Sequence, residues 1–192
     1  MILETIVTTH STSGGSHIAP MGVHLVGREY LIMPFRPSKT LENVLETRCA
    51  VINFTDDVRI FAGCLTGHRD WPLEPAERVE CSRLSETLAH TELQLVRVDE
   101  DALRPKLLCR PVHEVTHMPF RGFNRAQFSV LEAAILVSRL QRIPWEKIDR
   151  ELAYLRIGVE KTAGPRESQA WDWLMEVVEQ HRQRTTTEAI PE

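Results

Sequence analysis

The pattern of hydrophobic positions changes once along the chain. Over residues 1–117, short apolar stretches alternate with turn residues, which is typical of β-strands. Over residues 124–184, apolar residues recur at every third or fourth position, which is typical of amphipathic helices. The change predicts an α+β protein in which a strand-rich part precedes a helical part.

Six strands are predicted in the first part, from runs of apolar and β-branched residues that end at turn signals. They cover residues 2–9, 17–25, 29–33, 49–54, 91–98 and 107–117. One short helix is expected after Ser38, with Leu41 and Val44 on one face, and a second after residues 55–57. The stretch from Gly67 to Pro75 is polar and interrupted by prolines, which favours a surface loop.

Three helices are predicted in the second part. The first covers Asn124–Leu140 and has apolar residues on two sides, so we expect it to be buried on more than one face. Pro144 suits the first position of the next helix, over residues 145–155, because no N–H donor is needed there. A third helix is expected from about Glu167 to Gln183, and the residues after it lack periodicity.

The stretch from His17 to Gly22 interrupts a strand pattern. Pro20 cannot donate a hydrogen bond to a neighbouring strand, and Gly22 allows a backbone or a flat ligand to approach closely. Such a strand, next to a turn at Ser11–Gly15, suits one wall of a pocket for a planar cofactor. An edge strand whose proline faces solvent explains the pattern equally well, and the local sequence does not separate the two interpretations.

Composition excludes several classes of protein. The chain has 23 Lys and Arg against 27 Asp and Glu, so neither a nucleic-acid groove nor a polybasic membrane surface is expected. The first residues lack the basic region of a signal peptide, and no apolar run approaches the roughly 20 residues of a membrane helix. The four cysteines are scattered, which predicts reduced thiols, a cytoplasmic location and no zinc site.

The strongest local signal for ligand binding is Ser38-Lys39-Thr40 at a predicted helix start. The first turn of a helix has free N–H groups and a positive dipole end, which suit a phosphate. The lysine adds charge there, and Arg36 lies two residues before Ser38. Capping of the helix by Ser38, without any ligand, is the simpler explanation.

Two other helix starts are weaker candidates. Asn124 and Arg125 begin the long helix, where they suit either an anion site or a cap with a surface ion pair. Thr55-Asp56-Asp57 has acidic residues that would repel a phosphate, which favours a structural cap.

No catalytic or metal-binding motif is evident. His113 and His117 would lie about 13 Å apart in a straight strand, at about 3.3 Å per residue, too far to bind one metal ion as a pair. The sequence also lacks a Walker loop and a dinucleotide-binding fingerprint, and no arrangement of serine, histidine and aspartate is recognisable. No catalytic residue is therefore predicted.

Several motifs in order resemble one family. The segments ETIVTT, HIAPMGV, PFRPSKTLENV, NFTDDVRIFA and GFNRAQFSVLEAAILVSRL resemble the DUF447 proteins, relatives of the flavin-reductase-like FMN-binding split barrels. The resemblance implies an antiparallel split β-barrel with a helical C-terminal part, a homodimer, and FMN near the subunit interface. It divides the chain into a split-barrel domain at 1–118, a helical subdomain at 119–185 and a flexible tail at 186–192.

The resemblance also implies roles for individual residues. Ser38, Lys39 and Thr40 would bind the FMN phosphate, with Arg36 as a supporting charge. The strand that lines the flavin ring would consist of His17, Ile18, Ala19, Pro20, Met21 and Gly22. Asn53 and Thr55 would reach the ribityl chain or the ring, and Asn124 and Arg125 would complete the pocket. The family turn at Ser11–Gly15 is often longer and more acidic than here.

Three functions follow from these observations. The first is an FMN-dependent oxidoreductase that passes electrons through the flavin to an unidentified small molecule. The second is a non-catalytic flavin- or pterin-binding module, such as a cofactor carrier or assembly partner. The third is an interaction domain without a cofactor. Because the chain has no dinucleotide fingerprint, a nicotinamide electron donor would have to dock transiently.

Overall fold

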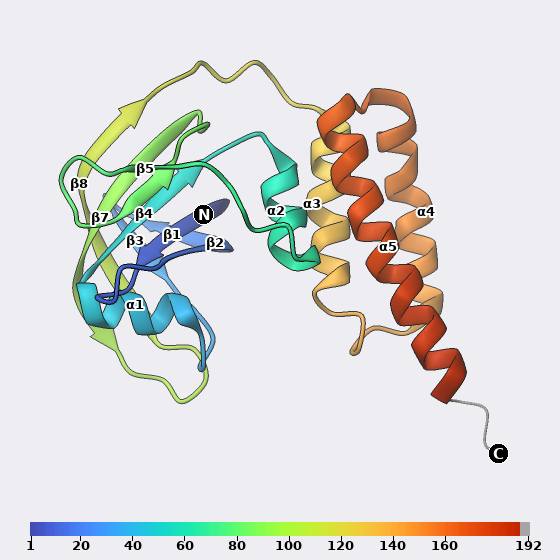
Figure 1. The fold of residues 1–192 in the computed structure, drawn as a ribbon, viewed down its shortest axis with the longest axis horizontal. Helices are drawn as coiled ribbons and strands as arrows, with labels where there is room; N and C mark the ends of the chain where they lie inside the picture. The colour runs from blue at the N-terminus through green and yellow to red at the C-terminus, as the bar shows by residue number, and fades with distance from the viewer. Residues whose placement is uncertain (189–192) are drawn as a thin grey trace. The chain divides into compact units, whose positions relative to one another are not determined.

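The computed structural model describes residues 1–188 and divides into two compact units. The barrel unit consists of Met1–Asp56 and Asp70–Phe120. The helical unit consists of Asp57–Arg69 and the chain from Arg121 onward. Figure 1 shows the strands with helix α1 in the first unit and the other helices in the second.

The barrel contains the six predicted strands. They are β1 (Ile2–His10), β2 (Ser16–Val26), β3 (Glu29–Ile32), β4 (Cys49–Phe54), β7 (Ala89–Asp99) and β8 (Lys106–Thr116). Every pairing is antiparallel, and the sheet closes in the order β1-β2-β3-β8-β7-β4. The strand β1 pairs with β2 along its whole length and with β4 at Ile6–Thr8.

The barrel interior is filled by alternate side chains of the strands and by one helix. Helix α1 (Lys39–Thr47) begins after Ser38, as predicted, and inserts Leu41 and Val44 among them. The buried strand residues include Val7, Val23, Ile32, Ala50, Ile52, Leu93, Leu95 and Leu107. Because the helix fills space between strands, its position relative to the barrel is set by core packing.

A small hairpin was not predicted. The strands β5 (Leu73–Pro75) and β6 (Ser82–Leu84) pair with each other, and β6 contacts β1 and β4. The prediction of a surface loop over 67–75 was therefore wrong for its last three residues. A three-residue strand is too short to show a period of two, so its sequence carried no strand signal.

The helical unit contains four helices, which are α2 (Val58–Thr66), α3 (Arg125–Val137), α4 (Trp145–Thr162) and α5 (Pro165–Glu188). The four surround one apolar core that includes Ala62, Val130, Ile148, Trp171 and Leu174. This core draws α2 into the helical unit, although the sequence places α2 between strands of the barrel. Within residues 1–188, no helix is both long and apolar enough to cross a membrane.

Several predicted helix bounds differ from the structure. Helix α3 ends at Val137 and not at Leu140, α4 continues past residue 155 to Thr162, and α5 begins at Pro165 and not at Glu167. Pro144 is the N-cap residue of α4, one position earlier than predicted, and Trp145 is the first helical residue. Helix α5 continues to Glu188, so 186–188 of the predicted tail are helical, whereas 189–192 lie outside the described residues. A helical turn of polar residues needs no apolar period, which is why the predicted helix ended early.

Gly158 of α4 allows close packing of two helices. A Cβ at this position would overlap Oγ of Ser129 in α3 and lie 3.2 Å from the carbonyl oxygen of Arg125. We expect Gly158→Ala to lower the free energy of unfolding by about 1–3 kcal/mol, the usual cost of overpacking. In a helix, alanine is normally more stable than glycine by about 1 kcal/mol. A lower free energy of unfolding in urea would therefore identify the close contact.

Ser129→Ala provides the matched control for this prediction. It removes Oγ and should restore most of the stability when combined with Gly158→Ala, since the two changes share one contact. A Gly158→Ala protein that is as stable as the parent would contradict the close packing.

Candidate functional site

The start of helix α1 carries backbone donors that the helix itself does not use. Ser38 is the N-cap residue, and its Oγ accepts a hydrogen bond from the N–H of Leu41 at 3.2 Å. The carbonyl of Ser38 accepts from the N–H of Glu42 at 3.1 Å. The N–H groups of Lys39 and Thr40 come before these bonds, where a helix offers no acceptor. The hydroxyl hydrogen of Ser38 also remains able to donate.

Two cations accompany this helix start. Arg36 forms an ion pair with Glu100 at 3.0 Å, and Lys39 forms one with Glu42 at 3.4 Å. All four side chains are largely exposed, and exposed pairs contribute little free energy, so both cations can turn toward an anion. The dipole of the helix favours negative charge at the same end. Thr40 is buried, unlike Lys39.

The stretch His17–Gly22 is a half-buried part of strand β2. Met21 packs against the barrel core, so the alternation of a strand turns Pro20 and Gly22 to the outer side. A Cβ on Gly22 would lie 3.1 Å from Cγ2 of Ile2 on β1. Glycine therefore permits close packing between β1 and β2 at this position.

Strand β1 lies between two of the candidate segments. Its Ile6 is opposite Pro20 of β2 on one side and opposite Asn53 of β4 on the other. Since adjacent strands are about 4.8 Å apart, the backbones of Pro20 and Asn53 are about 10 Å apart. Thr55 follows directly after β4 ends at Phe54. The fold thus brings the two predicted segments to one region of the sheet.

Asn53 is fully buried and holds the small hairpin against the barrel. Its Nδ2 donates to the carbonyl of Ile6 at 3.1 Å and to Oγ1 of Thr8 at 3.2 Å. Its Oδ1 accepts from the backbone N–H of Leu84 at 2.7 Å. The side chain of Asn53 is therefore occupied by structural hydrogen bonds in this structure.

Asn43 connects α1 to the strands, and the sequence analysis did not identify it. Its Nδ2 donates to Oγ1 of Thr9 at 3.0 Å, and Thr9 is paired with His17. The Oδ1 of Asn43 is buried and has no hydrogen-bond partner within residues 1–188. Asn43 falls off the predicted apolar face of Leu41 and Val44, so the sequence pattern carried no signal for it. An open buried acceptor beside the His17 segment is a place where a ligand hydroxyl can donate.

Asn124 and Arg125 belong to the helical unit. Asn124 is the N-cap of α3, and its Oδ1 accepts from the N–H of Ala126 at 2.7 Å. Its Nδ2 donates to the carbonyl of Thr162 at the end of α4, at 3.0 Å. Asn124 therefore joins two helices within this unit, while Arg125 is exposed.

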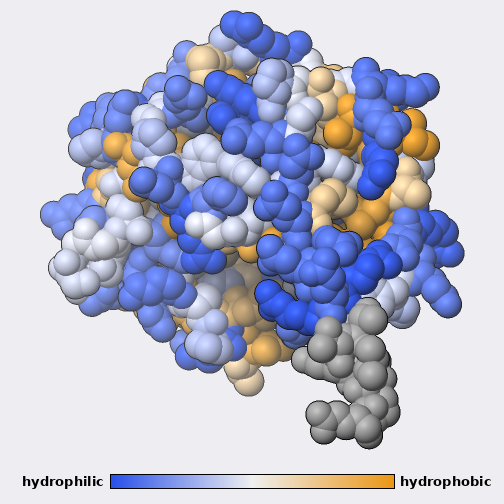
Figure 2. Space-filling view, turned by 45° about the vertical axis from the view of Figure 1, so that its right-hand side comes forward, coloured by the Kyte–Doolittle hydropathy of each residue, from blue (hydrophilic) through white to orange (hydrophobic). Residues whose placement is uncertain are grey.

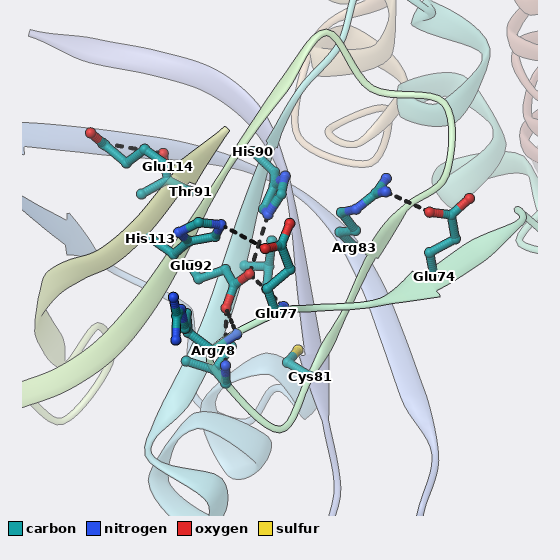
Figure 3. A network of polar contacts seen from close by, with 12 residues as sticks. Glu74, Glu77, Arg78, Cys81, Arg83, His90, Thr91, Glu92, His113 and Glu114 are labelled. Atoms are coloured by element: carbon teal, nitrogen blue, oxygen red, sulfur yellow. Dashed lines mark hydrogen bonds and ion pairs between the residues drawn. The ribbon is translucent and has the colours of Figure 1, made fainter. Parts of the chain in front are cut away.

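A buried polar network in the barrel unit was missed by the sequence analysis (Figure 3). Glu92 of β7 is fully buried, and its carboxylate accepts from three backbone N–H groups in succession. These belong to Glu77, Arg78 and Val79, at 2.7, 2.6 and 2.9 Å. Glu92 alternates with apolar residues, so the pattern placed it on a solvent-exposed face. The segment that covers it is far away in sequence.

Two histidines extend this network. Nε2 of His90 lies 3.3 Å from Oε1 of Glu92, and Nδ1 of His90 lies 2.8 Å from Nε2 of His117. Since the carboxylate can only accept, His90 carries its proton on Nε2 and accepts from His117 at Nδ1. His117 therefore keeps an unprotonated Nδ1, and its ring is exposed.

The network shifts two pKa values. Burial raises the pKa of Glu92, but the hydrogen bonds from Glu77, Arg78, His90 and Val79 outweigh burial, so the pKa lies below its usual value. Partial desolvation of the His117 ring, together with the charges of Arg83 and His90, lowers the pKa of His117. The two effects favour a Glu92 carboxylate and a neutral His117 near pH 7.

His113 lies at the edge of the same cluster. Its ring packs edge-on toward His90 at 6.1 Å, and Nε2 lies 3.2 Å from Oε2 of Glu77 without hydrogen-bond alignment. In the part of the chain that the structure describes, no group of three or more His, Cys, Asp and Glu side chains could hold a metal ion.

Comparison with solved structures supports the predicted architecture. An FMN-bound DUF447-family protein from Methanosarcina mazei is 22% identical, with a TM-score of 0.79 over 92% of this chain and 94% of that chain. A Shewanella frigidimarina protein with a split barrel domain is 14% identical, with a TM-score of 0.53 over 59% and 66%. An NADH:FAD oxidoreductase from Streptomyces globisporus is 12% identical, with a TM-score of 0.51 over 61% and 77%.

These likenesses confirm the predicted fold, an antiparallel split β-barrel of the flavin-reductase type with a helical C-terminal part. Among curated proteins, none matches the sequence. Two family models do match: the N-terminal domain of the DUF447 proteins of unknown function over residues 3–118, and a second DUF447 model over 124–176. The chain is therefore a member of the DUF447 family.

Proposed function

We propose that this protein is an FMN-binding flavoprotein that passes electrons through the bound flavin to a small molecule. The observation that carries the proposal is the start of helix α1. There, the N–H groups of the first turn, the Ser38 hydroxyl and two cations in exposed ion pairs belong to one short segment. This donor set fits a phosphate dianion. The FMN bound to the family member from Methanosarcina mazei supports the choice of ligand.

The chain's own residues would bind and orient the cofactor. Ser38, Lys39, Thr40 and Arg36 would hold the phosphate by N–H donors and charge. The His17–Gly22 strand would lie against the flavin ring, where backbone N–H and C=O groups can form hydrogen bonds with the edge of the ring. Thr55 and Asn53 would contact the ribityl chain. A role of Asn124 and Arg125 in binding FMN stays a prediction of the family resemblance.

When bound, FMN supplies the electron transfer, and the protein sets its position and environment. The NADH-dependent activity of the oxidoreductase from Streptomyces globisporus supports a nicotinamide as the electron donor. We propose a cytoplasmic location as well, which is supported by four scattered cysteines without the spacing of a disulfide framework.

We also propose a homodimer. Figure 2 shows that hydrophobic side chains on one face gather in several patches between hydrophilic ones. Exposed apolar side chains of the barrel unit include Val26, Phe35 and Val112, and a second chain would remove such groups from water. Light scattering of the purified protein distinguishes the dimer from a monomer.

Titration of the purified protein with FMN tests the proposal. We expect quenched flavin fluorescence and a higher melting temperature, equivalent to about 2.7 kcal/mol when free FMN is about a hundredfold above Kd. NAD(P)H added without oxygen should then bleach the yellow colour. Riboflavin, which lacks the phosphate, is the matched control and should bind more weakly.

The outcomes separate the alternatives. A protein that binds FMN but that no nicotinamide can bleach is a flavin-binding module without this activity. A protein whose melting temperature FMN and riboflavin leave unchanged is not a flavoprotein, which contradicts the proposal.

A further inference from the structure

Two cysteines that are far apart in the sequence meet outside the barrel core. Cys49 is the first residue of β4, and Cys81 directly precedes β6. Both are buried in one small cluster with Val51, against Ala76 and Val79. The sequence analysis found no cysteine pair, because 31 residues separate the two and only the hairpin brings them together.

Oxygen atoms of a hydroxyl group and of backbone carbonyls lie near the two thiols. Sγ of Cys49 lies 3.6 Å from Oγ1 of Thr47 and 3.7 Å from the carbonyl oxygen of Glu80. Sγ of Cys81 lies 3.5 Å from the carbonyl oxygen of Thr8. The Cys81 thiol is also within hydrogen-bonding reach of the Cys49 sulfur. The shared cluster thus places the two cysteine side chains together.

A cleft leads to this pair. It has a volume of about 710 Å³, and Cys81 forms part of its wall. The other walls are the turn after β1, the end of α1 at Glu46 and Thr47, and the segment from Pro75 to Ser82. The lining is mostly polar, so a small polar molecule can reach the wall that Cys81 forms, and Cys49 lies in the same cluster as Cys81.

We propose that Cys49 and Cys81 are a reversible redox pair, which a peroxide oxidises to a disulfide. The Cys49 thiolate attacks one oxygen of hydrogen peroxide, the O–O bond breaks, and hydroxide leaves and takes up a proton to become water. Cys49 is then a sulfenic acid. The sulfur of Cys81 attacks that of Cys49, the S–O bond breaks, and the departing hydroxide combines with the thiol proton of Cys81. Two thiols are oxidised and one peroxide is reduced to two waters.

The acidity of the Cys49 thiol distinguishes it from the other three cysteines, since the hydrogen bond to Cys49 and burial raise the pKa of Cys81. The hydrogen bond from Cys81 outweighs burial and lowers the pKa of Cys49 to about 7, and the Thr47 hydroxyl adds to the effect. Burial raises the pKa of Cys64 to about 11 and that of Cys109 to about 12. Because the thiolate is the reactive form, Cys64 and Cys109 are internal controls.

Peptide mapping of the full chain tests the proposal. The folded protein is treated with hydrogen peroxide, its remaining thiols are alkylated after unfolding, and it is digested with trypsin. Peptides 49–59 and 79–83 should be found joined, about 2 Da lighter than their sum because two hydrogen atoms are lost. Cys64 and Cys109 should be alkylated, and dithiothreitol should separate the joined peptides.

Two variants test the order of the steps. Cys81→Ser should accumulate the sulfenic acid on Cys49, which dimedone traps, and the pH midpoint of Cys49 alkylation should rise above about 7. Cys49→Ser should form neither the joined peptides nor a trapped adduct on Cys81. Absence of the joined peptides from the oxidised parent protein would overturn the proposal, and so would equal oxidation of Cys64 and Cys109.

Discussion

Glu92→Gln is expected to lower the free energy of unfolding by about 3 kcal/mol, because buried donors lose a charged acceptor. The Glu92 carboxylate accepts hydrogen bonds from the backbone N–H groups of residues 77–79 and lies beside His90. Glutamine keeps one carbonyl oxygen and turns an NH₂ group toward donors. At least one N–H group would therefore lose its acceptor inside the protein, where water cannot replace it. Urea unfolding at pH 7 measures the loss.

Glu114→Gln is the matched control for this change. Glu114 lies on the neighbouring strand β8, is exposed, and accepts from Thr91 at 3.4 Å. Its replacement should change stability by less than about 0.5 kcal/mol, as exposed substitutions usually do. If Glu92→Gln cost no more than Glu114→Gln, the bonds to residues 77–79 would not support the fold.

The effect of Glu92 should depend on pH. Its pKa is lowered in the folded protein, so the folded state favours the carboxylate more than the unfolded state does. The stabilisation is therefore present above the unfolded pKa of about 4.3 and is lost as the pH falls through the lower folded pKa. The difference in stability between the parent and Glu92→Gln should shrink below about pH 4.

Ser38→Asp is expected to weaken FMN binding by about a hundredfold or more, because a carboxylate next to a phosphate repels it by several kcal/mol. The fold should be unaffected, since aspartate caps a helix about as well as serine does, and Leu41 N–H would keep an acceptor. Fluorescence titration with FMN gives the change in Kd. The melting temperature without FMN shows whether the protein is intact.

Ser38→Asn separates charge from capping. Asparagine also caps the helix but carries no charge, so its effect on FMN affinity should be much smaller. The double change Ser38→Ala with Thr40→Ala should also weaken binding, although Thr40 is buried and its loss affects packing. A folded Ser38→Asp protein that binds FMN like the parent would contradict the phosphate site at this helix.

Local patterns in the sequence were sufficient for the barrel strands and for the caps of α1, α2 and α3. Ser38, Asp57 and Asn124 are each the N-cap of the helix that their position predicted. Their side chains bond to N–H groups two or three residues ahead, so the signal lies within a few residues. The roles of these and the other candidate residues in binding FMN remain predictions.

Contacts between distant segments could not be predicted in the same way. The sequence by itself determined the six strands, the helical second part, the capped helix starts and the family resemblance, because short-range periodicity and motif order carry that information. Only the tertiary structure decided that the hairpin covers Glu92, that Cys49 meets Cys81, and that α2 joins the helical core. These groupings depend on which surfaces exclude water together, and that is a property of the folded chain and not of any one segment.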